Sequence, residues 1–408
     1  MERADVVILG GGIGGCSLGA KLASTGLQIL ILERETDFTD RVRGEWIAPW
    51  GVVELQRLDL YDRVMAAGGH HITRHIPYDE LVSPKEAEAT AMPLNLVKGV
   101  AGPLAIEHVV LQNSALDKAI ESGCSVKRGV ANIEIKPGSN PRVSYEHDGG
   151  SLQCDCRLIV GADGRTSTVR RQSGLEIVED PVDHLIAGLL VDNADDWPED
   201  LEAVGKYGNM YYFIFPQGNG KIRLYADFDL EDRGRFTGES GAKEMLSAFN
   251  MACVPNSGAI SKATPIGPCR TFPSQDAWVD DPFVDGVVLI GDAAGYNDPI
   301  LGQGLSVTLR DTRIVSDLLI EHTAWHRDLF IPYGVERKER LRRLRLCAQF
   351  VTTMNARFGS EAEARRVRAK RRIRRDPTLQ LIQLAAFVGP EQVQAKYFEP
   401  GFQEALFK

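Results

Sequence analysis

The chain has 408 residues, of which 43% are apolar and 25% are charged, so it can fold into two or three domains around substantial cores. Its net charge of −9 argues against nucleic acid as the main partner. It has no run of the roughly 18 to 20 apolar residues needed to span a bilayer, so we expect no stable membrane insertion. The N-terminal residues show no targeting pattern, and we expect a cytoplasmic protein.

The seven cysteines and eight histidines do not form a recognisable metal-binding pattern. Cys154 and Cys156 form a close pair, but no second pair follows at zinc-site spacing. The odd number of scattered cysteines does not indicate a disulfide framework. We therefore expect no metal, and we interpret the two cysteines as half-buried positions of a strand.

The N-terminal segment reads as a strand, a helix and a second strand. Residues 5–9 are an apolar run, the helix extends to about residue 25, and residues 27–32 form the second strand. Glycines of the G-x-G-x-x-G pattern separate the first strand from the helix, and a carboxylate ends the second strand, namely Gly10, Gly12, Gly15 and Glu33. Such a loop lets a pyrophosphate approach the helix N-terminus, while the carboxylate accepts hydrogen bonds from a ribose. The unit predicts dinucleotide binding and favours an adenosine without a 2′-phosphate.

The middle of the chain changes to strand patterns. Residues 78–102 are irregular, residues 113–121 indicate a helix, and strands are expected at 126–135, 142–147, 152–160, 185–191, 210–215 and 221–228. The tetrapeptide 217–220 (Gln-Gly-Asn-Gly) predicts a hairpin turn, because its residues adopt positive φ at little cost. A further helix is expected at 242–251, and the chain is helical after Gly302.

Two more glycine- and aspartate-containing stretches follow strand patterns. Asp163 lies in Gly-Ala-Asp-Gly-Arg after one strand, and Asp292 lies in Gly-Asp-Ala-Ala after another. Pro299, Gly302 and Gly304 then open a long helix. Ligands bind at the carboxyl ends of parallel strands, and backbone N–H groups at a helix start can bind phosphate or an electron-rich ring.

Taken together, residues 1 to about 345 resemble the group A flavoprotein monooxygenases, the family of para-hydroxybenzoate hydroxylase. The resemblance implies that the first glycine motif binds the adenosine half of FAD and that the Asp163 stretch contacts both FAD and NAD(P)H. It places Asp292 against the ribityl chain and pyrophosphate, and Pro299 beside the isoalloxazine ring. Arg43 falls where the family often has an arginine near the flavin, and we expect Arg43 and Pro299 to be the residues closest to catalysis.

Three further positions bear on that resemblance. Asp311 falls where the family has an acid in the helix after the proline loop. Gln112 or Asn113 could stand where the family has an Arg or Gln facing the flavin, and Gln112 is our choice. Gly295 replaces a histidine that the family usually has, which suggests more room in this loop.

The resemblance implies an α/β fold with a Rossmann-like FAD-binding domain, an inserted β-sheet substrate domain and a helical C-terminal extension. We expect the FAD-binding domain at 1–77, 103–180 and 273–335, the substrate domain at 78–102 and 181–272, and the helical region at 336–408. The implied activity is NAD(P)H-dependent insertion of one oxygen atom from O2 into an aromatic or other hydrophobic small molecule, through a flavin C4a-hydroperoxide. A reductase or halogenase of the same fold, or a non-catalytic dinucleotide-binding sensor, remains an alternative.

Several features leave two interpretations open. Tyr211, Tyr212, Phe213 and Tyr225 would line one face of the substrate sheet or pack in a core. Trp46 and Trp50 could stack on a ligand or fix a helix. The basic run 365–375 is expected to be a solvated face or the contact of a homodimer, rather than a binding patch.

Overall fold

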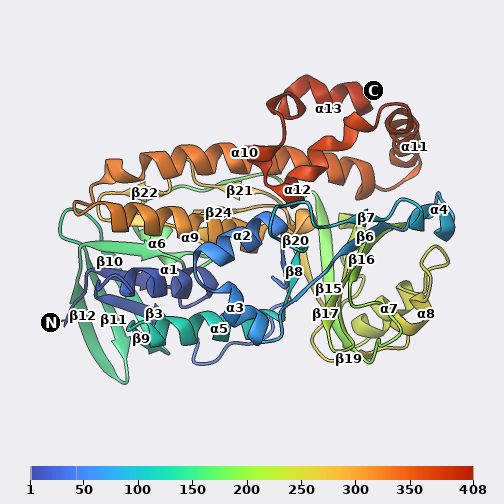
Figure 1. Cartoon of the computed structure of the whole chain (residues 1–408). Coiled ribbons are helices and arrows are strands. Elements are labelled where there is room, and N and C mark those ends of the chain that lie inside the picture. Colours follow the sequence, from blue (N-terminus) through green and yellow to red (C-terminus); the bar gives the residue numbers. More distant parts are fainter. Residues whose placement is uncertain (1, 43, 408) are drawn as a thin grey trace.

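The computed structural model describes residues 2–42 and 44–407 and shows an α/β fold with several sheets and a set of C-terminal helices (Figure 1). One half of the molecule holds a six-stranded sheet, and the other half holds an eight-stranded sheet. No helix among the described residues combines the length and the apolar character that a membrane span requires.

The six-stranded sheet has the order β22-β23-β13-β2-β3-β9, and every neighbouring pair is parallel except β22 and β23. Its strands are β2 Val6–Leu9, β3 Ile29–Glu33, β9 Ser125–Arg128, β13 Leu158–Gly161, β22 Phe283–Val284 and β23 Val287–Leu289. The central strands β2 and β13 are buried along their whole length because both faces of the sheet are covered. This confirms the strand predicted at residues 5–9.

Helices cover one face of this sheet and a smaller sheet covers the other. The helices are α1 Ile13–Ala23, α5 His108–Glu121 and α9 Gly304–Glu321, which share an apolar core with the strands. The smaller sheet has the order β1-β12-β11-β10, with β1 Glu2–Arg3, β10 Ala131–Lys136, β11 Arg142–His147 and β12 Gly150–Asp155. Cys154 is fully buried in the core between the two sheets, so its position is structural.

The carboxyl ends of strands β2, β13 and β23 lie side by side at one edge of the six-stranded sheet. Gly161 of β13 lies opposite Leu9 of β2 on one side and Leu289 of β23 on the other. The loops that follow these strands therefore start at the same edge of the sheet, where open α/β folds bind ligands. All three predicted motifs begin at that edge.

The eight-stranded sheet has the order β19-β15-β18-β17-β16-β6-β7, and β20 also pairs with β15. Its strands are β6 Arg74–Pro77, β7 Met92–Pro93, β15 His184–Asp192, β16 Leu201–Tyr207, β17 Met210–Gly218, β18 Lys221–Phe228, β19 Thr264–Pro265 and β20 Arg270–Ser274. The hairpin between β17 and β18 is confirmed, with positive φ at Gly218, Asn219 and Gly220. Because β6 and β16 are parallel neighbours, this sheet also includes residues before position 78, and the predicted domain boundaries stay a prediction.

The two faces of this sheet differ in their surroundings. One face packs against α7 Gly241–Ala248 and α8 Ser257–Ile260 in an apolar core that contains Tyr212. Tyr211 and Phe213 lie on the other face and pack against the C-terminal helices. Alternation along the strand thus separates Tyr212 from Tyr211 and Phe213, and the prediction that all four aromatic residues share one face is wrong for Tyr212.

Several predicted elements have different bounds, among them the strand expected at 152–160, which is two strands in different sheets, β12 and β13. The strand expected at 126–135 is two strands in different sheets, β9 and β10, separated by a turn in which Gly129 has a positive φ of 73°. The helix expected from residue 113 begins at His108. Residues 78–102, expected to be irregular, contain the short helix α4 Pro84–Glu88 and β7.

The C-terminal region, residues 331–407, crosses both halves of the molecule (Figure 1). It contains α10 Ile331–Asn355, α11 Ser360–Arg375, the 3-10 segment η5 Pro377–Leu384, α12 Ala385–Val388 and α13 Pro400–Phe407. One face of α11 is buried, where Arg366 pairs with Asp79 of the 78–102 segment. Arg368, Arg371, Arg374 and Arg375 of the same helix are exposed. The basic helix thus anchors the C-terminal region on one side and is solvated on the other.

Shorter elements complete the described part of the chain. A three-stranded sheet joins β4 Trp46–Ile47, β8 Leu104–Ala105 and β5 His70–His71, and another joins β14 Val178–Glu179, β21 Ala277–Trp278 and β24 Gly295–Tyr296. The remaining α-helices of the described residues are α2 Pro49–Arg57, α3 Tyr61–Ala66 and α6 Thr168–Gln172.

Candidate active site

A cavity of about 390 Å³ runs from the glycine loop at the N-terminus of α1 to the aromatic face of the eight-stranded sheet. Six of the predicted site residues line it, namely Gly12, Gln112, Asp292, Pro299, Gly302 and Gly304. Gly10, Gly15, Glu33 and Asp163 do not line it. Arg43 lies outside the described residues, so its predicted role stays a prediction.

The three motif glycines meet different steric demands. A Cβ atom on Gly10, where φ is +105°, would lie 2.3 Å from the carbonyl oxygen of Ala162, and one on Gly15 would lie 1.9 Å from the carbonyl oxygen of Gly10. Side chains at these positions would push the strand, the loop and the helix apart. Around Gly12, by contrast, a Cβ atom would meet nothing within 4 Å, so the backbone borders open space. That open cradle at the start of α1 fits a pyrophosphate.

Glu33 and Asp163 use their carboxylates to hold loops. The Glu33 carboxylate accepts hydrogen bonds from the backbone N–H groups of Gly11 (2.6 Å) and Glu35 (2.8 Å). Asp163 accepts from the Ser167 hydroxyl (2.5 Å) and from the N–H groups of Thr168 (2.6 Å) and Val169 (3.2 Å), at the start of α6. Both residues therefore shape the loops at the cavity edge, and a direct contact with a cofactor stays a prediction for each.

The Gly-Asp motif is fixed to the C-terminal helices through Asp311. This fully buried carboxylate accepts hydrogen bonds from the N–H of Gly291 (2.9 Å), from Arg337 Nε (2.9 Å) and from Arg340 Nη2 (2.6 Å). Although burial opposes it, the two guanidinium groups hold the pKa of Asp311 below its ordinary value. Asp292 follows Gly291, lines the cavity and lies 3.3 Å from Arg165 Nε.

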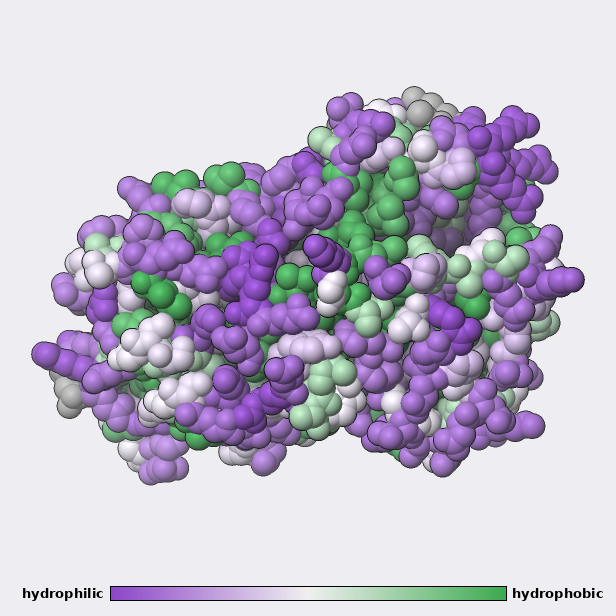
Figure 2. All heavy atoms as spheres, viewed as in Figure 1, coloured by the Kyte–Doolittle hydropathy of each residue, from purple (hydrophilic) through white to green (hydrophobic). Residues whose placement is uncertain are grey.

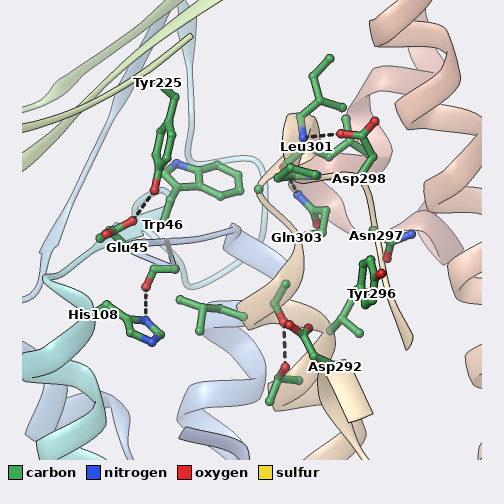
Figure 3. Close-up of a pocket in the computed structure, with 18 of the residues that line it drawn as sticks. Glu45, Trp46, His108, Tyr225, Asp292, Tyr296, Asn297, Asp298, Leu301 and Gln303 are labelled. Atoms are coloured by element: carbon green, nitrogen blue, oxygen red, sulfur yellow. Dashed lines mark hydrogen bonds between the residues drawn. The ribbon is translucent and has the colours of Figure 1, made fainter. Parts of the chain in front are cut away.

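The proline loop forms the next part of the wall (Figure 3). The carboxylate of Asp298 accepts from the N–H of Ile300 (2.9 Å), which starts the short 3-10 turn at Pro299. Gly302 has a φ of +64° and α9 begins at Gly304. Gln303 accepts from Trp50 Nε1 (2.9 Å) and donates to the carbonyl of Ala386 (3.1 Å). Trp50 therefore fixes the loop, while Trp46 lines the cavity.

Gln112 is the better placed of the two α5 candidates. It lines the cavity, and its Oε1 atom is buried without a hydrogen-bond partner among the described residues, whereas Asn113 is exposed. A buried amide oxygen of this kind is normally satisfied by a bound group or water. We therefore interpret Gln112 Oε1 as a hydrogen-bond acceptor for a bound ligand.

A glycine is needed at position 295 for a reason that differs from the extra room in the loop predicted from the sequence. Its φ is +113°, and a Cβ atom there would lie 2.4 Å from the carbonyl oxygen of Ala277 and 2.5 Å from the Cα of Trp278. These residues belong to β21, which pairs with Gly295 and Tyr296. The expected extra room is absent, because the backbone of β21 occupies the space that a side chain would take.

Aromatic side chains line the part of the cavity farthest from the glycine loop. They come from the eight-stranded sheet, from the segment after Arg43 and from α12, and they are Tyr211, Phe213, Phe215, Tyr225, Phe272, Trp46 and Phe387. Trp46 contacts Phe215 and Phe387 with ring centroids 6.1 and 6.0 Å apart. Figure 2 shows hydrophobic side chains gathered on this side of the molecule where the C-terminal helices meet the rest of the chain. This chamber suits a flat or otherwise apolar molecule.

Two buried carboxylates organise the polar groups of this chamber. Glu202 is 1% exposed and accepts hydrogen bonds from Trp46 Nε1 (2.8 Å) and His75 Nδ1 (2.8 Å). Glu45 accepts from the Tyr225 hydroxyl (2.7 Å) and pairs with Arg223 (2.7 Å), which also pairs with Asp40 (2.9 Å). Burial raises the pKa of Tyr225 well above its ordinary value, so its hydroxyl stays protonated.

Sequence reasoning missed these groups and the contribution of α12. Glu202 and Phe387 belong to no predicted motif, and only the fold brings them to the cavity, whereas Asp298 lies beside the predicted Pro299 and could have been found from it. Among the described residues, no group of three or more His, Cys, Asp or Glu side chains is arranged to hold a metal ion. The open backbone at Gly12, the unsatisfied Gln112 and the helix start at Gly304 fit a dinucleotide whose ring reaches the aromatic chamber. The residues present thus fit FAD.

Two curated relatives are similar in sequence. Digeranylgeranylglycerophospholipid reductase 2 of Methanothermobacter thermautotrophicus is 25% identical over 352 residues, covering 78% of this chain and 78% of the relative. Rifampicin monooxygenase of Streptomyces venezuelae is 24% identical over 311 residues, covering 75% of this chain and 62% of the relative.

Two solved structures illustrate the fold. The p-nitrophenol 4-monooxygenase PnpA of Pseudomonas putida DLL-E4 superimposes with a TM-score of 0.78 at 17% identity, covering 93% of this chain and 96% of that one. The flavin-dependent halogenase CmlS superimposes with a TM-score of 0.75 at 16% identity, covering 100% of this chain and 76% of that one. The fold is therefore that of group A flavoprotein monooxygenases and the halogenases related to them.

A family model described as an FAD binding domain matches residues 3–345. The match runs from β1 into α10 and contains every motif that reaches the cavity. The chain therefore belongs to this FAD binding domain family and is a flavoprotein of the FAD-dependent oxidoreductases.

Proposed function

We propose that this protein is a monooxygenase that uses NAD(P)H and FAD to insert one oxygen atom from O2 into an aromatic or other hydrophobic small molecule. One observation supports this most strongly. The groove at Gly12 and the aromatic chamber around Trp46 are parts of one cavity, joined at the Pro299 loop. A substrate in the chamber would therefore lie against the ring end of the cofactor.

The chain's own residues would bind and orient both molecules. Bound FAD would supply the electron transfer and oxygen activation, chemistry that side chains alone cannot perform. Gly12, Asp292 and the N-terminus of α9 would hold its phosphates and ribityl chain, and Pro299 and Gln112 would position its ring. The aromatic walls would exclude water from the substrate, and Glu202 would keep Trp46 and His75 in place.

A reductase is the second candidate. The relative from Methanothermobacter thermautotrophicus is named a reductase, and the alignment covers 78% of both chains. An apolar chamber also suits a substrate whose C=C bond is reduced. The halogenase alternative is weaker, because the signature Trp-x-Trp-x-Ile-Pro is missing, and the segment 46–50 reads Trp-Ile-Ala-Pro-Trp. A non-catalytic sensor would leave the aromatic chamber without a use.

An experiment with labelled O2 distinguishes these candidate functions by whether an oxygen atom from O2 enters the product. FAD-loaded protein is mixed with NADH or NADPH and a panel of aromatic and polyketide-like compounds under labelled O2. We expect reductant consumption to accelerate with the true substrate and one labelled oxygen atom to appear in the product. A product that forms without O2 and has gained two hydrogens would establish the reductase, and halide incorporation would establish the halogenase. No stimulation by any compound, together with tight FAD binding, would favour the sensor.

A further inference from the structure

A second cavity, of about 330 Å³, lies next to the proline loop. Its walls are polar and include Asp180, Asp183, Asp276, Asp298, Thr352 and Arg357. Pro181 and Gln349 at its rim are exposed, so solvent reaches it. Asp298 also lines the candidate active site, and it is thus common to the described walls of both cavities.

His184 lies between these two cavities. Its side chain is 1% exposed at the start of β15. The Nδ1 atom is 3.6 Å from Asp183 Oδ2, on the side of the second cavity. The Nε2 atom is 3.7 Å from Asp298 Oδ1 and 3.7 Å from Asp227 Oδ1. The two ring nitrogens therefore face carboxylates at opposite ends of a short path.

Asp227 connects this path to the active-site wall. It lies opposite Tyr211 in the pairing of β17 with β18 and opposite Ile186 in the pairing of β15 with β18. Side chains directly opposite one another in an antiparallel pair project from the same face. Tyr211 and Ile186 both line the candidate active site, so Asp227 belongs to the same face of the sheet.

The polar side-chain atoms of His184 and Asp227 are not locked into direct hydrogen bonds with described residues. Both ring nitrogens of His184 and both carboxylate oxygens of Asp227 are buried without a hydrogen-bond partner among the described residues. Separations of 3.6 to 3.7 Å exceed a direct hydrogen bond but are closed by a small ring rotation or a bridging water. Such an arrangement can change partners, which a rigid structural pair cannot.

The surrounding charges keep protons on the cluster. Burial raises the pKa of Asp227 to about 8 and also raises the pKa of Asp298. Although burial opposes it, Asp227, Asp183 and Asp298 raise the pKa of His184 to about 9. Asp183 is itself paired with Arg357, and Arg165 lies on the active-site side of Asp298. Around neutral pH the cluster therefore retains protons, which the histidine ring and the carboxyl groups can exchange.

We propose that His184, together with Asp227 and Asp298, is a proton relay that carries protons from the second cavity to the candidate active site. In each passage the N–H bond at Nε2 breaks and its proton passes to an ionised Asp298 or Asp227, a ring flip turns the bare nitrogen toward Asp183, and a proton arriving through Asp183 forms a new N–H bond there. One proton moves in each passage and no electrons move. This inference rests on the proposed function, in which NAD(P)H, O2, substrate and one solvent proton give NAD(P)⁺, hydroxylated substrate and water.

Replacing His184 with alanine tests the relay by chemical rescue. The His184→Ala variant removes the relay and leaves a hole that a free imidazole can fill. We expect NAD(P)H oxidation to slow by about tenfold or more and to recover with added imidazole in a saturable manner. His70→Ala is the matched control, because both ring nitrogens of His70 are also buried without a partner among the described residues, but His70 lies in β5 of a different sheet. Rescue of neither variant, or of both equally, would overturn the relay.

Infrared spectroscopy gives a readout that does not depend on activity. In resting FAD-loaded protein at pH 7, we expect a protonated carboxylic acid band that disappears in Asp227→Asn or in Asp298→Asn. Persistence of the band in both variants would contradict the relay, even if the enzyme oxygenates its substrate. The converse result, band loss without any oxygenation, would sink only the proposed function. If His184→Ala does not fold, Asp183→Asn at the partly exposed end of the path is measured instead and should slow NAD(P)H oxidation without rescue by imidazole, and an unchanged rate would overturn the relay.

Discussion

At the scale of single residues, Glu33 holds the glycine loop in place through hydrogen bonds to its backbone. Its carboxylate accepts hydrogen bonds from two backbone N–H groups, at Gly11 and Glu35, and does not line the cavity. The Gly11 bond crosses from the end of β3 to the loop that leaves β2. Glu33 therefore orders the cradle itself, whatever contact it also makes with a ribose.

Glu33→Ala should weaken FAD binding by roughly 1 to 3 kcal/mol, because it removes charge-assisted hydrogen bonds that hold the loop. Fluorescence quenching of added FAD measures the effect. Glu33→Gln is the matched control and should retain part of the affinity, since its amide oxygen can still accept from Gly11. Equal affinity of wild type and Glu33→Ala would mean that the loop keeps its shape without the carboxylate.

Gly295→Ala should destabilise the protein by about 1 to 3 kcal/mol, because the new methyl group meets the backbone of β21 and φ is positive. Gly258→Ala, at a position where a Cβ atom meets nothing within 4 Å, is the control and should change little. Thermal unfolding of FAD-loaded protein reports both. A normal melting temperature for Gly295→Ala would show that β21 moves away easily.

Much of the cofactor groove could be predicted from the sequence, because its residues sit in motifs with fixed local geometry. Gly12 and Asp292 line the cavity for that reason. Glu202 and Phe387 could not be predicted, because they reach the chamber only through sheet pairing and helix packing over long sequence distances. Gly295 was misinterpreted, since its backbone partner at Ala277 belongs to a two-residue strand with no sequence signal.

At the scale of elements, the C-terminal helices form part of the active-site wall. Gln383, Ala386 and Phe387 line the cavity, and Gln303 of the proline loop donates to the carbonyl of Ala386. We expected this region to matter for association or solubility rather than for the chemistry. Its packing shows that η5 and α12 also close the chamber, while the basic α11 secures them through Arg366.

Phe387→Ala should weaken the binding of an aromatic ligand by about 1 to 3 kcal/mol and leave FAD content unchanged, because it removes apolar wall area far from the glycine loop. Phe402→Ala is the control, since Phe402 packs in the same C-terminal core and does not line the cavity. Isothermal titration with the best compound of the substrate panel gives both affinities. Equal losses in the two variants would point to a general loosening of the C-terminal region.

At the scale of the whole molecule, the cluster around His184 couples stability to pH. The pKa values of His184, about 9, and of Asp227, about 8, lie above their ordinary values of 6.5 and 3.8. The folded chain therefore binds more protons than the unfolded chain, and stability falls as pH rises. The contribution of His184 is fully present below pH 6.5 and is lost as pH rises through 9.

We accordingly expect the melting temperature of FAD-loaded protein to decline between pH 6.5 and 9, and to decline less steeply in His184→Gln. Differential scanning fluorimetry across that range measures both slopes. His70→Gln should follow the wild type, because burial lowers the pKa of His70 instead of raising it. Parallel slopes for wild type and His184→Gln would mean that His184 does not bind the extra proton.

The strand order of the six-stranded sheet also determines how much of the chain must be synthesised before the sheet can be completed. β2 lies in the middle of this sheet, but its neighbour β13 begins at residue 158, and β23 on the far side of β13 begins at residue 287. A growing chain on the ribosome therefore holds β2 with one edge unpaired until β13 is made, and then holds β13 with one edge unpaired until β23 is made. The nucleotide cradle is complete only when Gly304 has emerged. We therefore expect FAD to bind late in biosynthesis, after a period in which unpaired strand edges are open to aggregation.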